Sequence, residues 1–191
     1  MTATKGHGGE LALAALRRYG VEEIFTLNGA HIWPLYDAFV KAGLPIYDTR
    51  HEETAGFAAE GLAKLTRRPG LAALTAGPGV TNGLSPVATA QQTGSPLIVI
   101  GGRAAQNKWG QGSLQEFDHV PLLSAITKSA QTAVTTEDIA AVVDAAARTA
   151  LTPHRGPTFV DVPLDAFFGS AEAELPDAEL PRAPAPDPDE V

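Results

Sequence analysis

Glu52 is the residue whose chemistry stands out first. It lies between His51 and Glu53, where a short extended run gives way to a helical pattern. A carboxylate in the first turn of a helix is normally stabilised by the free backbone amides there. If small apolar side chains of the same helix enclose it, its proton affinity rises instead. Such a group can hold or donate a proton near neutral pH. In a second interpretation, Glu52 or Glu53 only interacts with the helix dipole.

A glycine-rich segment, Ala76–Asn82, follows a predicted strand and precedes a predicted helix. Glycines at such a junction let backbone amides approach a ligand. The segment is not the dinucleotide-binding fingerprint, because Asn82 stands where the third glycine belongs, and no Gly-Lys-Ser/Thr follows to make a P-loop. It also lacks the serine of a hydrolase nucleophile elbow. The segment is therefore either a ligand-binding loop or an ordinary tight turn.

The turn Asn28–His31 ends another predicted strand, and it is either a second ligand-side loop or a common strand-to-helix turn. The histidines of the chain show none of the spacings of a metal site; they are His7, His31, His51, His119 and His154. The chain has no cysteine, which excludes thiolate chemistry and cysteine-held metals. We therefore expect no metal to be held by this chain's own residues.

Helical and extended patterns alternate along the chain. Apolar residues recur at helical spacing in Glu10–Arg18, Ile32–Lys41, Glu52–Thr66, about Thr81–Gln92 and Glu137–Leu151. Short β-rich runs are Glu23–Leu27, Leu44–Tyr47, Gly70–Leu74, Leu97–Ile100, Thr127–Val134 and Pro157–Val162. Pro86 marks a late start or a kink in the fourth helix. The alternation predicts an α/β fold, a doubly wound and mostly parallel six-stranded sheet with helices on both faces.

Sheets of this kind bind ligands beyond the carboxyl ends of their strands. The loops at such ends carry turn residues or titratable groups, and they are Asn28–His31, Asp48–Glu53 and Ala76–Asn82. A further segment, Gly101–Val120, is long and polar, and a long loop inside a compact domain is usually functional. We therefore expect the chemistry at this edge of the sheet.

Length and composition limit the possible classes of protein. The chain has 191 residues, 44% of them hydrophobic, which is enough for one domain with a buried core. Its apolar runs are too short to cross a membrane or to form the core of a signal peptide. The net charge is −8, and no basic patch for nucleic acid is visible. We expect a cytoplasmic protein without a membrane or nucleic-acid partner.

The composition changes after Phe168 and Gly169. Residues 170–191 carry seven acids, one arginine and five prolines, which is typical of an extended connector. We expect residues 1–169 to form the domain and residues 170–191 to form a Pro-rich acidic linker or tail. A frayed terminus without a role is the alternative.

Together these motifs resemble the N-terminal pyrimidine-binding domain of thiamine diphosphate enzymes. The resemblance runs from about Gly8 to Phe168, and the segments in register are Arg50–Glu53, Ala58–Gly61 with Leu65–Thr66, and Ala76–Asn82. The branch is the acetolactate synthase-like one, which includes benzoylformate decarboxylase, oxalyl-CoA decarboxylase and 2-hydroxyacyl-CoA lyase. The resemblance implies the thiamine diphosphate-binding fold.

The resemblance places the family's catalytic glutamate at Glu52. It implies that this carboxyl group hydrogen-bonds N1′ of the aminopyrimidine and so promotes loss of the thiazolium C2 proton, while the cofactor carries the carbon chemistry. The implied cofactor-binding residues are Asn28, Gly29, Ala30, Glu52, Gly77, Pro78, Gly79 and Asn82. His31 and Gln115 are placed on the substrate side, with a structural role for His31 as the alternative. Asn28 and Ala30 depart from the family's turn, which leaves the substrate preference open.

The same resemblance implies an incomplete site. The family binds the diphosphate and Mg²⁺ through a C-terminal Gly-Asp-Gly motif, and this chain has no Gly-Asp-Gly. We therefore expect half of a transferase or C–C lyase that acts on 2-oxo acids, inactive as an isolated chain. Its partner would be a diphosphate-binding domain or subunit, in a homodimer or higher oligomer. FAD, which some relatives carry on a middle domain, is left open.

Other interpretations differ in substrate or in class. A 2-hydroxyacyl-CoA lyase or oxalyl-CoA decarboxylase-like component would take an acyl-CoA. Leu97–Gly102, followed by a long polar loop and Gln115–Phe117, suits that branch. Leu114–Phe117 resembles the family's Phe-Gln-Glu segment, in which Leu114 replaces the aromatic residue. A non-catalytic assembly module of the same fold would use the small-residue faces of Glu52–Thr66 and Thr81–Gln92 for close contacts. A Rossmann module would bind NAD, but the missing third glycine argues against it.

Overall fold

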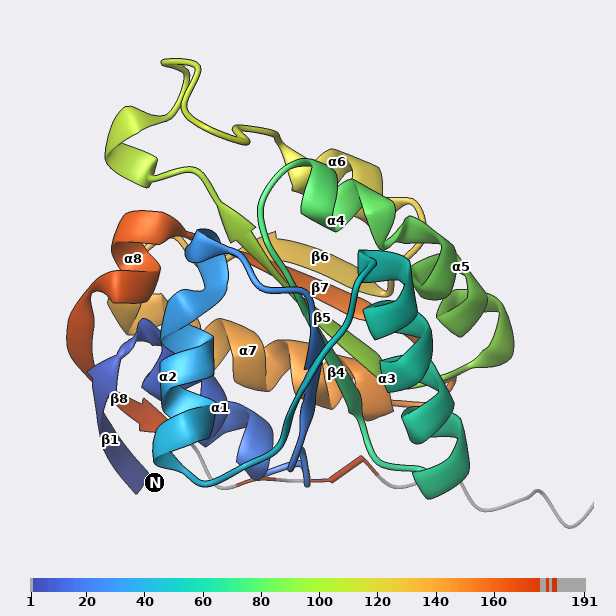
Figure 1. Cartoon of the computed structure of the whole chain (residues 1–191). Coiled ribbons are helices and arrows are strands. Elements are labelled where there is room, and N and C mark those ends of the chain that lie inside the picture. Colours follow the sequence, from blue (N-terminus) through green and yellow to red (C-terminus); the bar gives the residue numbers. More distant parts are fainter. Residues whose placement is uncertain (1, 176–177, 179, 182–191) are drawn as a thin grey trace, which may run out of the picture.

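The computed structural model of the chain describes residues 2–175, 178, 180 and 181. Its main sheet has the strand order β3-β2-β4-β5-β7-β6, and all neighbouring strands are parallel (Figure 1). The strands are β2 (Ile24–Thr26), β3 (Ile46–Asp48), β4 (Gly70–Leu74), β5 (Leu97–Arg103), β6 (Ser129–Thr132) and β7 (Thr158–Pro163). The predicted six-stranded α/β fold is confirmed, and this sheet is parallel throughout.

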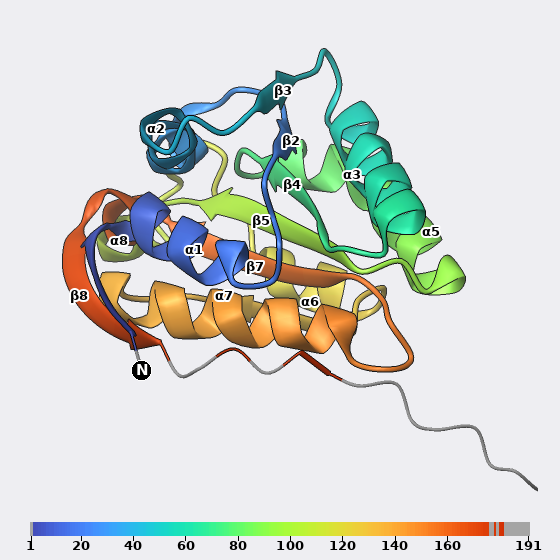
Figure 2. The same ribbon diagram turned by 90° about the horizontal axis from the view of Figure 1, so that it is seen from below.

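Helices cover both faces of this sheet, as Figure 2 shows. One face carries α1 (Gly8–Arg17), α2 (Trp33–Lys41) and α7 (Thr136–Leu151), and the other carries α3 (Glu52–Thr66), α5 (Leu84–Thr93) and α6 (His119–Ser124). Shorter elements are α4 (Pro78–Asn82), α8 (Leu164–Phe168) and the 3₁₀ turns Ala30–Ile32 and Gln106–Lys108. This is the doubly wound arrangement that the sequence predicts.

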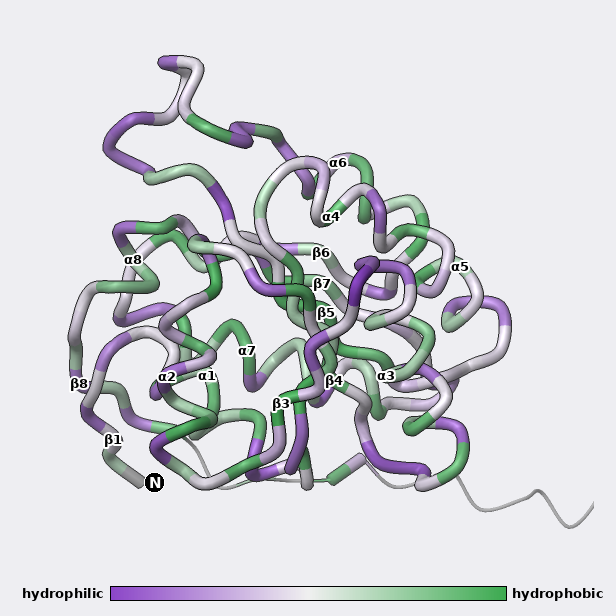
Figure 3. The backbone as a smooth tube through the Cα atoms, viewed as in Figure 1, coloured by the Kyte–Doolittle hydropathy of each residue, from purple (hydrophilic) through white to green (hydrophobic). Residues whose placement is uncertain are grey.

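Side-chain alternation along the central strands builds the two halves of the core. Leu71 and Ala73 of β4 pack with α1, α2 and α7, whereas Ala72 and Leu74 pack with α3 and α5. Because both faces are buried, β4 and β5 are apolar along most of their length, and Figure 3 shows them largely in green. The carboxyl ends of these rigid strands hold the loops described below.

The start of α3 is set by a capping residue. The side chain of His51 accepts a hydrogen bond from the Glu53 amide at 3.2 Å, which satisfies one free donor of the first turn. Further along, a Cβ atom placed on Gly56 would lie 2.3 Å from the ring of Pro86 in α5, so glycine allows the two helices to pack closely. Glu52 therefore stands at the first position of a helix that is tightly held.

The helix predicted over about Thr81–Gln92, with a late start or kink at Pro86, is divided in the structure into α4 and α5, with a break at Gly83. Pro86 has no amide to donate to the Asn82 carbonyl, so the helical ladder is interrupted there. The helical region also begins earlier than predicted, at Pro78, because proline is favoured in the first turn of a helix. The break leaves Asn82 at the last position of α4.

A second, two-stranded sheet joins distant parts of the sequence. Strand β1 (Thr2–His7) pairs antiparallel with β8 (Ser170–Leu175), and Leu175 is 3% exposed within the main core. The structure thus places residues 170–175 in a strand rather than in a linker, so the folded part extends to Leu175. The alternation of small or apolar with charged residues in this segment is the period-two signal of a strand. The linker prediction from residue 176 onward lies mostly outside the described residues.

The other predicted elements are present with small shifts at their ends. Because β5 continues to Arg103 and α6 begins at His119, the predicted polar loop Gly101–Val120 shortens to residues 104–118. Across the part of the chain that the structure describes, no helix combines the length and the apolar character needed to span a membrane.

Candidate functional site

Two loops meet where the winding of the sheet reverses. From β2 the chain crosses through α2 to the edge strand β3, and then returns through α3 to β4 on the other side of β2. Ligands of doubly wound sheets bind at such a switch point, beyond the carboxyl ends of the strands. The loops after β2 and β4 contain the predicted segments Asn28–His31 and Ala76–Asn82, which therefore flank the same edge.

Thr75, the first residue after β4, brings these loops into contact. A Cβ atom placed on Gly29 would lie 2.4 Å from Thr75 Oγ1, and one placed on Gly79 would lie 2.6 Å from Thr75 Cγ2. Both glycines therefore pack against this side chain too closely for a larger residue. Thr75 was not among the residues predicted from the sequence, although its position between a buried strand and the glycine segment could have indicated it.

Glu52 lies beside the same loop, only 8% exposed. The Asn82 side chain donates a hydrogen bond from Nδ2 to Glu52 Oε2 at 3.1 Å. A Cβ atom placed on Gly79 would lie 3.4 Å from Glu52 Oε1. Within the described residues, Oε1 has no hydrogen-bond partner. The structure thus brings together three of the predicted residues and leaves one carboxyl oxygen available to a donor from outside the chain.

Most amides of the glycine segment already have partners within the chain. The Gly77 amide donates to His119 Nε2 at 3.0 Å, and the Gly79 and Val80 amides donate to the carbonyl groups of Ala76 and Gly77. Of the two interpretations of this segment, these contacts favour the tight turn for these three amides, because the short helix α4 and His119 already use them. The glycines contribute space beside Glu52 instead.

Gln115 lies against the start of this segment. Gly77 has φ 57° and ψ −117°, and a Cβ atom placed on it would lie 2.9 Å from the Gln115 carbonyl oxygen. Gln115 itself has φ 57°, a left-handed conformation that is uncommon outside glycine and often marks a functional site. Gln115 thus lies against Gly77, and the next residue of the segment, Pro78, is exposed.

Asn28 and Ala30 are exposed in the turn after β2. The Asn28 amide donates to Asp48 Oδ1 at 3.1 Å, and Trp33 Nε1 donates to the Asn28 side-chain oxygen at 2.8 Å. These contacts fix the turn. Neither Asn28 nor Ala30 forms a hydrogen bond with Glu52 among the residues described here, so they border the site rather than join its centre.

His31 is buried at the end of this turn, 6% exposed, with Nδ1 3.4 Å from Thr75 Oγ1. Burial disfavours the charged ring and lowers the pKa of His31 below the ordinary value of 6.5. A neutral imidazole can accept a proton at one nitrogen and donate one at the other. His31 is therefore buried beside Thr75 at the end of the turn that follows β2.

A cavity of about 500 Å³ opens next to His31. Its walls are mainly apolar, and it lies between the β2 turn, the segment after β5 and α8. The lining residues are Ala30, His31, Ala104, Ala105, Asn107, Lys108, Ser113, Leu114, Leu164, Asp165 and Phe168. Leu114, which departs from the family pattern, belongs to this wall. The cavity therefore adjoins the site at His31.

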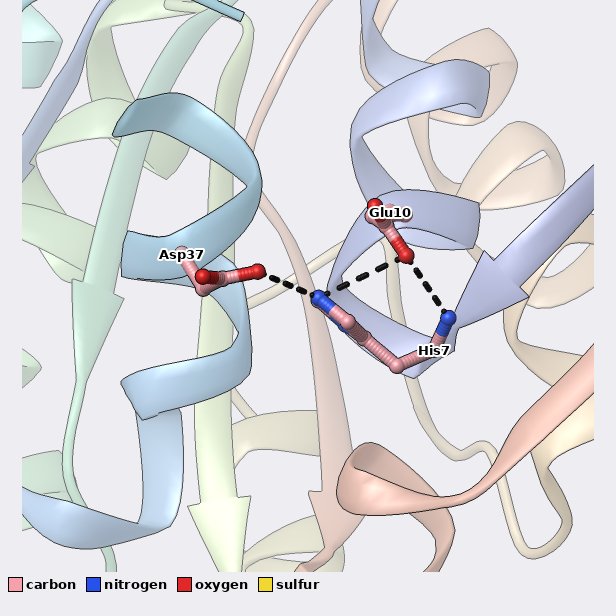
Figure 4. A group of neighbouring side chains, drawn as sticks. All are labelled: His7, Glu10 and Asp37. Carbon is pink, nitrogen blue, oxygen red and sulfur yellow. Dashed lines mark hydrogen bonds and ion pairs between the residues drawn. The ribbon is translucent and has the colours of Figure 1, made fainter. Parts of the chain in front are cut away.

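A group of potential metal ligands, His7, Glu10 and Asp37, lies elsewhere, between α1 and α2 (Figure 4). His7 Nδ1 accepts the Gly9 amide, so the neutral ring carries its proton on Nε2, which lies 2.7 Å from Asp37 Oδ2. Lys41 pairs with Glu10 at 3.2 Å and with Asp37 at 2.8 Å. The three side chains thus already have structural roles, His7 as a helix cap and Glu10 and Asp37 in ion pairs with Lys41.

Comparison with known proteins decides the family. The model of the thiamine pyrophosphate enzyme N-terminal TPP binding domain matches residues 6–122. The chain belongs to this family. Thiamine pyrophosphate is the cofactor also called thiamine diphosphate, so the resemblance stated from the sequence is confirmed.

The relatives of this TPP-binding domain are longer enzymes. It is 49% identical over 183 residues to a probable acetolactate synthase of Mycobacterium bovis, covering 94% of this chain and 34% of the relative. It is 43% identical over 165 residues to 2-hydroxyacyl-CoA lyase 2 of Caenorhabditis elegans, covering 86% of this chain and 26% of the relative. The human lyase of the same name is 42% identical over 166 residues, with coverages of 87% and 26%. The chain thus spans about a third or less of these enzymes and corresponds to their N-terminal part.

The site of this TPP-binding domain fits the aminopyrimidine end of the cofactor. Glu52 is a buried residue whose Oε1 has no hydrogen-bond partner among the residues that the structure describes, and the missing side chain of Gly79 leaves room next to that oxygen. No cluster of metal ligands was found at this edge among the described residues, where the His7 group is the one recorded. The donor set therefore suits a nitrogen heterocycle rather than a metal-bound diphosphate.

Proposed function

We propose that this chain supplies the pyrimidine-binding half of the active site of a thiamine diphosphate-dependent enzyme that acts on 2-oxo acids, as an acetolactate synthase does. The observation that carries the proposal is the buried residue Glu52 at the switch point, with Oε2 bonded to Asn82 and Oε1 without a hydrogen-bond partner within the described part of the chain. The 49% identity to an acetolactate synthase supports the choice of reaction class.

Each residue then has a physical task. Glu52 Oε1 accepts a hydrogen bond from N1′ of the aminopyrimidine and holds the proton at that atom. Asn82, bonded to Oε2 at 3.1 Å, fixes the orientation of the carboxyl group. Burial of Glu52 keeps water away, which strengthens this hydrogen bond. When bound, thiamine diphosphate supplies the carbon nucleophile and the electron sink for the reaction.

The rest of the active site is proposed to lie on another domain or subunit that holds the diphosphate and Mg²⁺. The coverage of 34% of the synthase relative leaves room for such a domain in a longer enzyme. Large apolar side chains exposed on this chain support assembly into a dimer or higher oligomer, with Phe57 41% and Leu65 87% exposed on α3. The cytoplasmic location stays a prediction, and FAD stays open.

A second candidate is a 2-hydroxyacyl-CoA lyase, with oxalyl-CoA decarboxylase as a related reaction. The cavity of about 500 Å³ beside His31 favours it, because an apolar space of this size holds more than the small side chain of a short 2-oxo acid. The 43% identity to a 2-hydroxyacyl-CoA lyase 2 points the same way. Activity assays with both substrate classes distinguish the two.

The experiment that tests the proposal compares Glu52→Gln with Glu53→Gln in the enzyme that carries this chain. Both substitutions remove one negative charge from the first turn of α3, but only Glu52 faces Asn82 and Gly79. We expect Glu52→Gln to abolish turnover while assembly is kept, and Glu53→Gln to leave turnover largely intact. Normal turnover of the Glu52 variant would favour the non-catalytic assembly module.

A further inference from the structure

His119 is fully buried at the start of α6 and joins two distant parts of the chain. The Gly77 amide donates a hydrogen bond to its Nε2 at 3.0 Å, and its Nδ1 lies 3.1 Å from Asp161 Oδ2. A backbone amide can only donate, so Nε2 must be without a proton. The neutral ring therefore carries its proton on Nδ1 and donates it to Asp161. The contacts on both sides assign a single tautomer.

Asp161 is itself held in place on β7, with no exposed surface. Arg103 Nη1 donates to Asp161 Oδ2 at 3.2 Å, and the Arg103 guanidinium carbon lies 3.6 Å from the centre of the Trp109 ring. A charge-assisted hydrogen bond to a buried carboxylate fixes the position of both partners. A chain of hydrogen bonds thus connects the sheet to the glycine segment, through Arg103, Asp161, His119 and Gly77.

Gly77 determines where α4 begins, since α4 starts at the next residue. Helix α4 carries Gly79, which lies against Glu52, and Asn82, which bonds to Glu52 at 3.1 Å. A shift of the Gly77 amide would therefore move both contacts of the Glu52 carboxyl group. His119 is the one side chain that holds this amide among the described residues.

We infer that His119 is a positioning residue for the cofactor site. In the tautomer set by Asp161, its Nε2 anchors the Gly77 amide and so fixes α4 relative to the Glu52 carboxyl group. The inference rests on the proposed function, because the importance of the Glu52 position comes from its role toward the cofactor. His119 also packs near Phe117 and Phe159, with ring centres 5.4 and 6.0 Å away, so a role in packing alone must be separated by experiment.

The first test uses the full chain, labelled with ¹⁵N, without any cofactor. Long-range ¹H–¹⁵N NMR spectra report which ring nitrogen of His119 carries the proton. We expect an unprotonated Nε2, a protonated Nδ1 and a hydrogen-bond coupling between Nε2 and the Gly77 amide. A ring with its proton on Nε2 would overturn the inference. This measurement needs no variant and is independent of what Glu52 does.

The second test compares His119→Gln with His119→Leu in the same chain. Glutamine can place an acceptor oxygen near the position of Nε2, whereas leucine fills the space without an acceptor. We expect hydrogen exchange of the Gly77 amide to rise about tenfold or more in the leucine variant, as for loss of one buried hydrogen bond, and the Asn82 side-chain amide resonances to shift. The glutamine variant should restore most of both. A folded leucine variant with unchanged Gly77 and Asn82 signals would contradict the inference.

A third readout separates this inference from the proposed function. In the enzyme that carries this chain, His119→Leu should raise the thiamine diphosphate concentration for half-maximal activity by about tenfold, with turnover recovering when cofactor is in excess. Loss of turnover that excess cofactor does not restore would show that His119 does more than position the loop. If Glu52→Gln stays active while the NMR results hold, the proposed function fails and the His119 contact stands as loop anchoring alone.

Discussion

Glu52 and Asn82, 30 positions apart in the sequence, are joined by a hydrogen bond of 3.1 Å from the asparagine Nδ2 to the glutamate Oε2. One residue opens α3 and the other closes α4. The bond occupies one carboxyl oxygen and turns the other toward Gly79, where no side chain stands in the way. The orientation of the proposed proton-holding group is thus set by an amide side chain, as a preorganised site requires.

Replacing Gly79 by alanine should damage the site. The new Cβ would lie 2.6 Å from Thr75 Cγ2 and 3.4 Å from Glu52 Oε1. Overpacking of this kind lowers the free energy of unfolding by about 1–3 kcal/mol, and we expect weaker cofactor binding as well. Urea denaturation and titration of activity with thiamine diphosphate measure the two effects.

The matched control is Gly61→Ala in α3, where nothing lies within 4 Å of the new Cβ. Alanine replaces glycine there inside a helix, so the free energy of unfolding should rise by up to about 1 kcal/mol. If Gly79→Ala changes the free energy of unfolding and cofactor binding no more than Gly61→Ala does, neither property requires the close packing around Glu52.

The stability of the chain should depend on the protonation of His31. The folded-state pKa of His31 lies below the ordinary value of 6.5, because burial disfavours the charged ring. Between the two pKa values the unfolded chain binds more protons, so stability rises with pH. The contribution of neutral His31 to the free energy of unfolding is fully present above pH 6.5, and it is lost as the pH falls through the folded-state pKa.

The variant His31→Asn tests this dependence. Asparagine keeps a polar group near Thr75 and does not titrate, so the loss of stability from about pH 8 to about pH 5 should be smaller than in the parent chain. At the higher pH, where His31 is not titrating, the difference in unfolding free energy between the two proteins reports only the changed packing at this position. Equal losses of unfolding free energy on acidification would show that His31 is not the group responsible.

Leu175 should stabilise the domain, although it lies in the segment that the sequence analysis assigned to a linker. It is 3% exposed and packs in the main core. We expect Leu175→Ala to lower the free energy of unfolding by about 2 kcal/mol or more. Leu180→Ala, at a position 62% exposed, should change it by less than about 0.5 kcal/mol. Equal effects would mean that β8 is not part of the folded unit.

The cavity beside His31 allows a test of substrate class. Phenylalanine at Ala105 would fill part of the cavity. If the enzyme acts on 2-hydroxyacyl-CoA, Ala105→Phe should impair turnover of long acyl chains much more than turnover of short 2-oxo acids. The control is Val40→Phe on α2, at a position 69% exposed. Equal turnover of long acyl chains by both variants would exclude the cavity as an acyl site.

The sequence predicted those features that depend on local pattern. The spacing of apolar residues located the strands of the sheet and most of the helices. The change from an extended run to a helical pattern correctly placed Glu52 in the first turn of α3. The two-stranded sheet β1–β8 was missed, because pairing between opposite ends of a domain leaves no local signal beyond weak alternation. The break at Gly83 was indicated by Pro86, but a kink and a late start looked alike from the sequence.

The centre of the site was predictable in part. Glu52, Gly79 and Asn82 were found through a resemblance whose motifs are specific, and the structure brings them together. His119 was seen only as one of several scattered histidines. Its contacts to Gly77 and Asp161 each span 42 positions in the sequence, and contacts of such range cannot be read from spacing.

The most direct test of the account is the rate at which the C2 proton of bound thiamine diphosphate exchanges with solvent. The enzyme that carries this chain would be compared with its Glu52→Gln and Glu53→Gln variants. Proton transfer assisted by a placed group typically contributes about a hundredfold or more, so exchange should slow by at least that factor in the Glu52 variant and remain nearly unchanged in the Glu53 variant. Undiminished exchange in Glu52→Gln would contradict the role assigned to this carboxyl group.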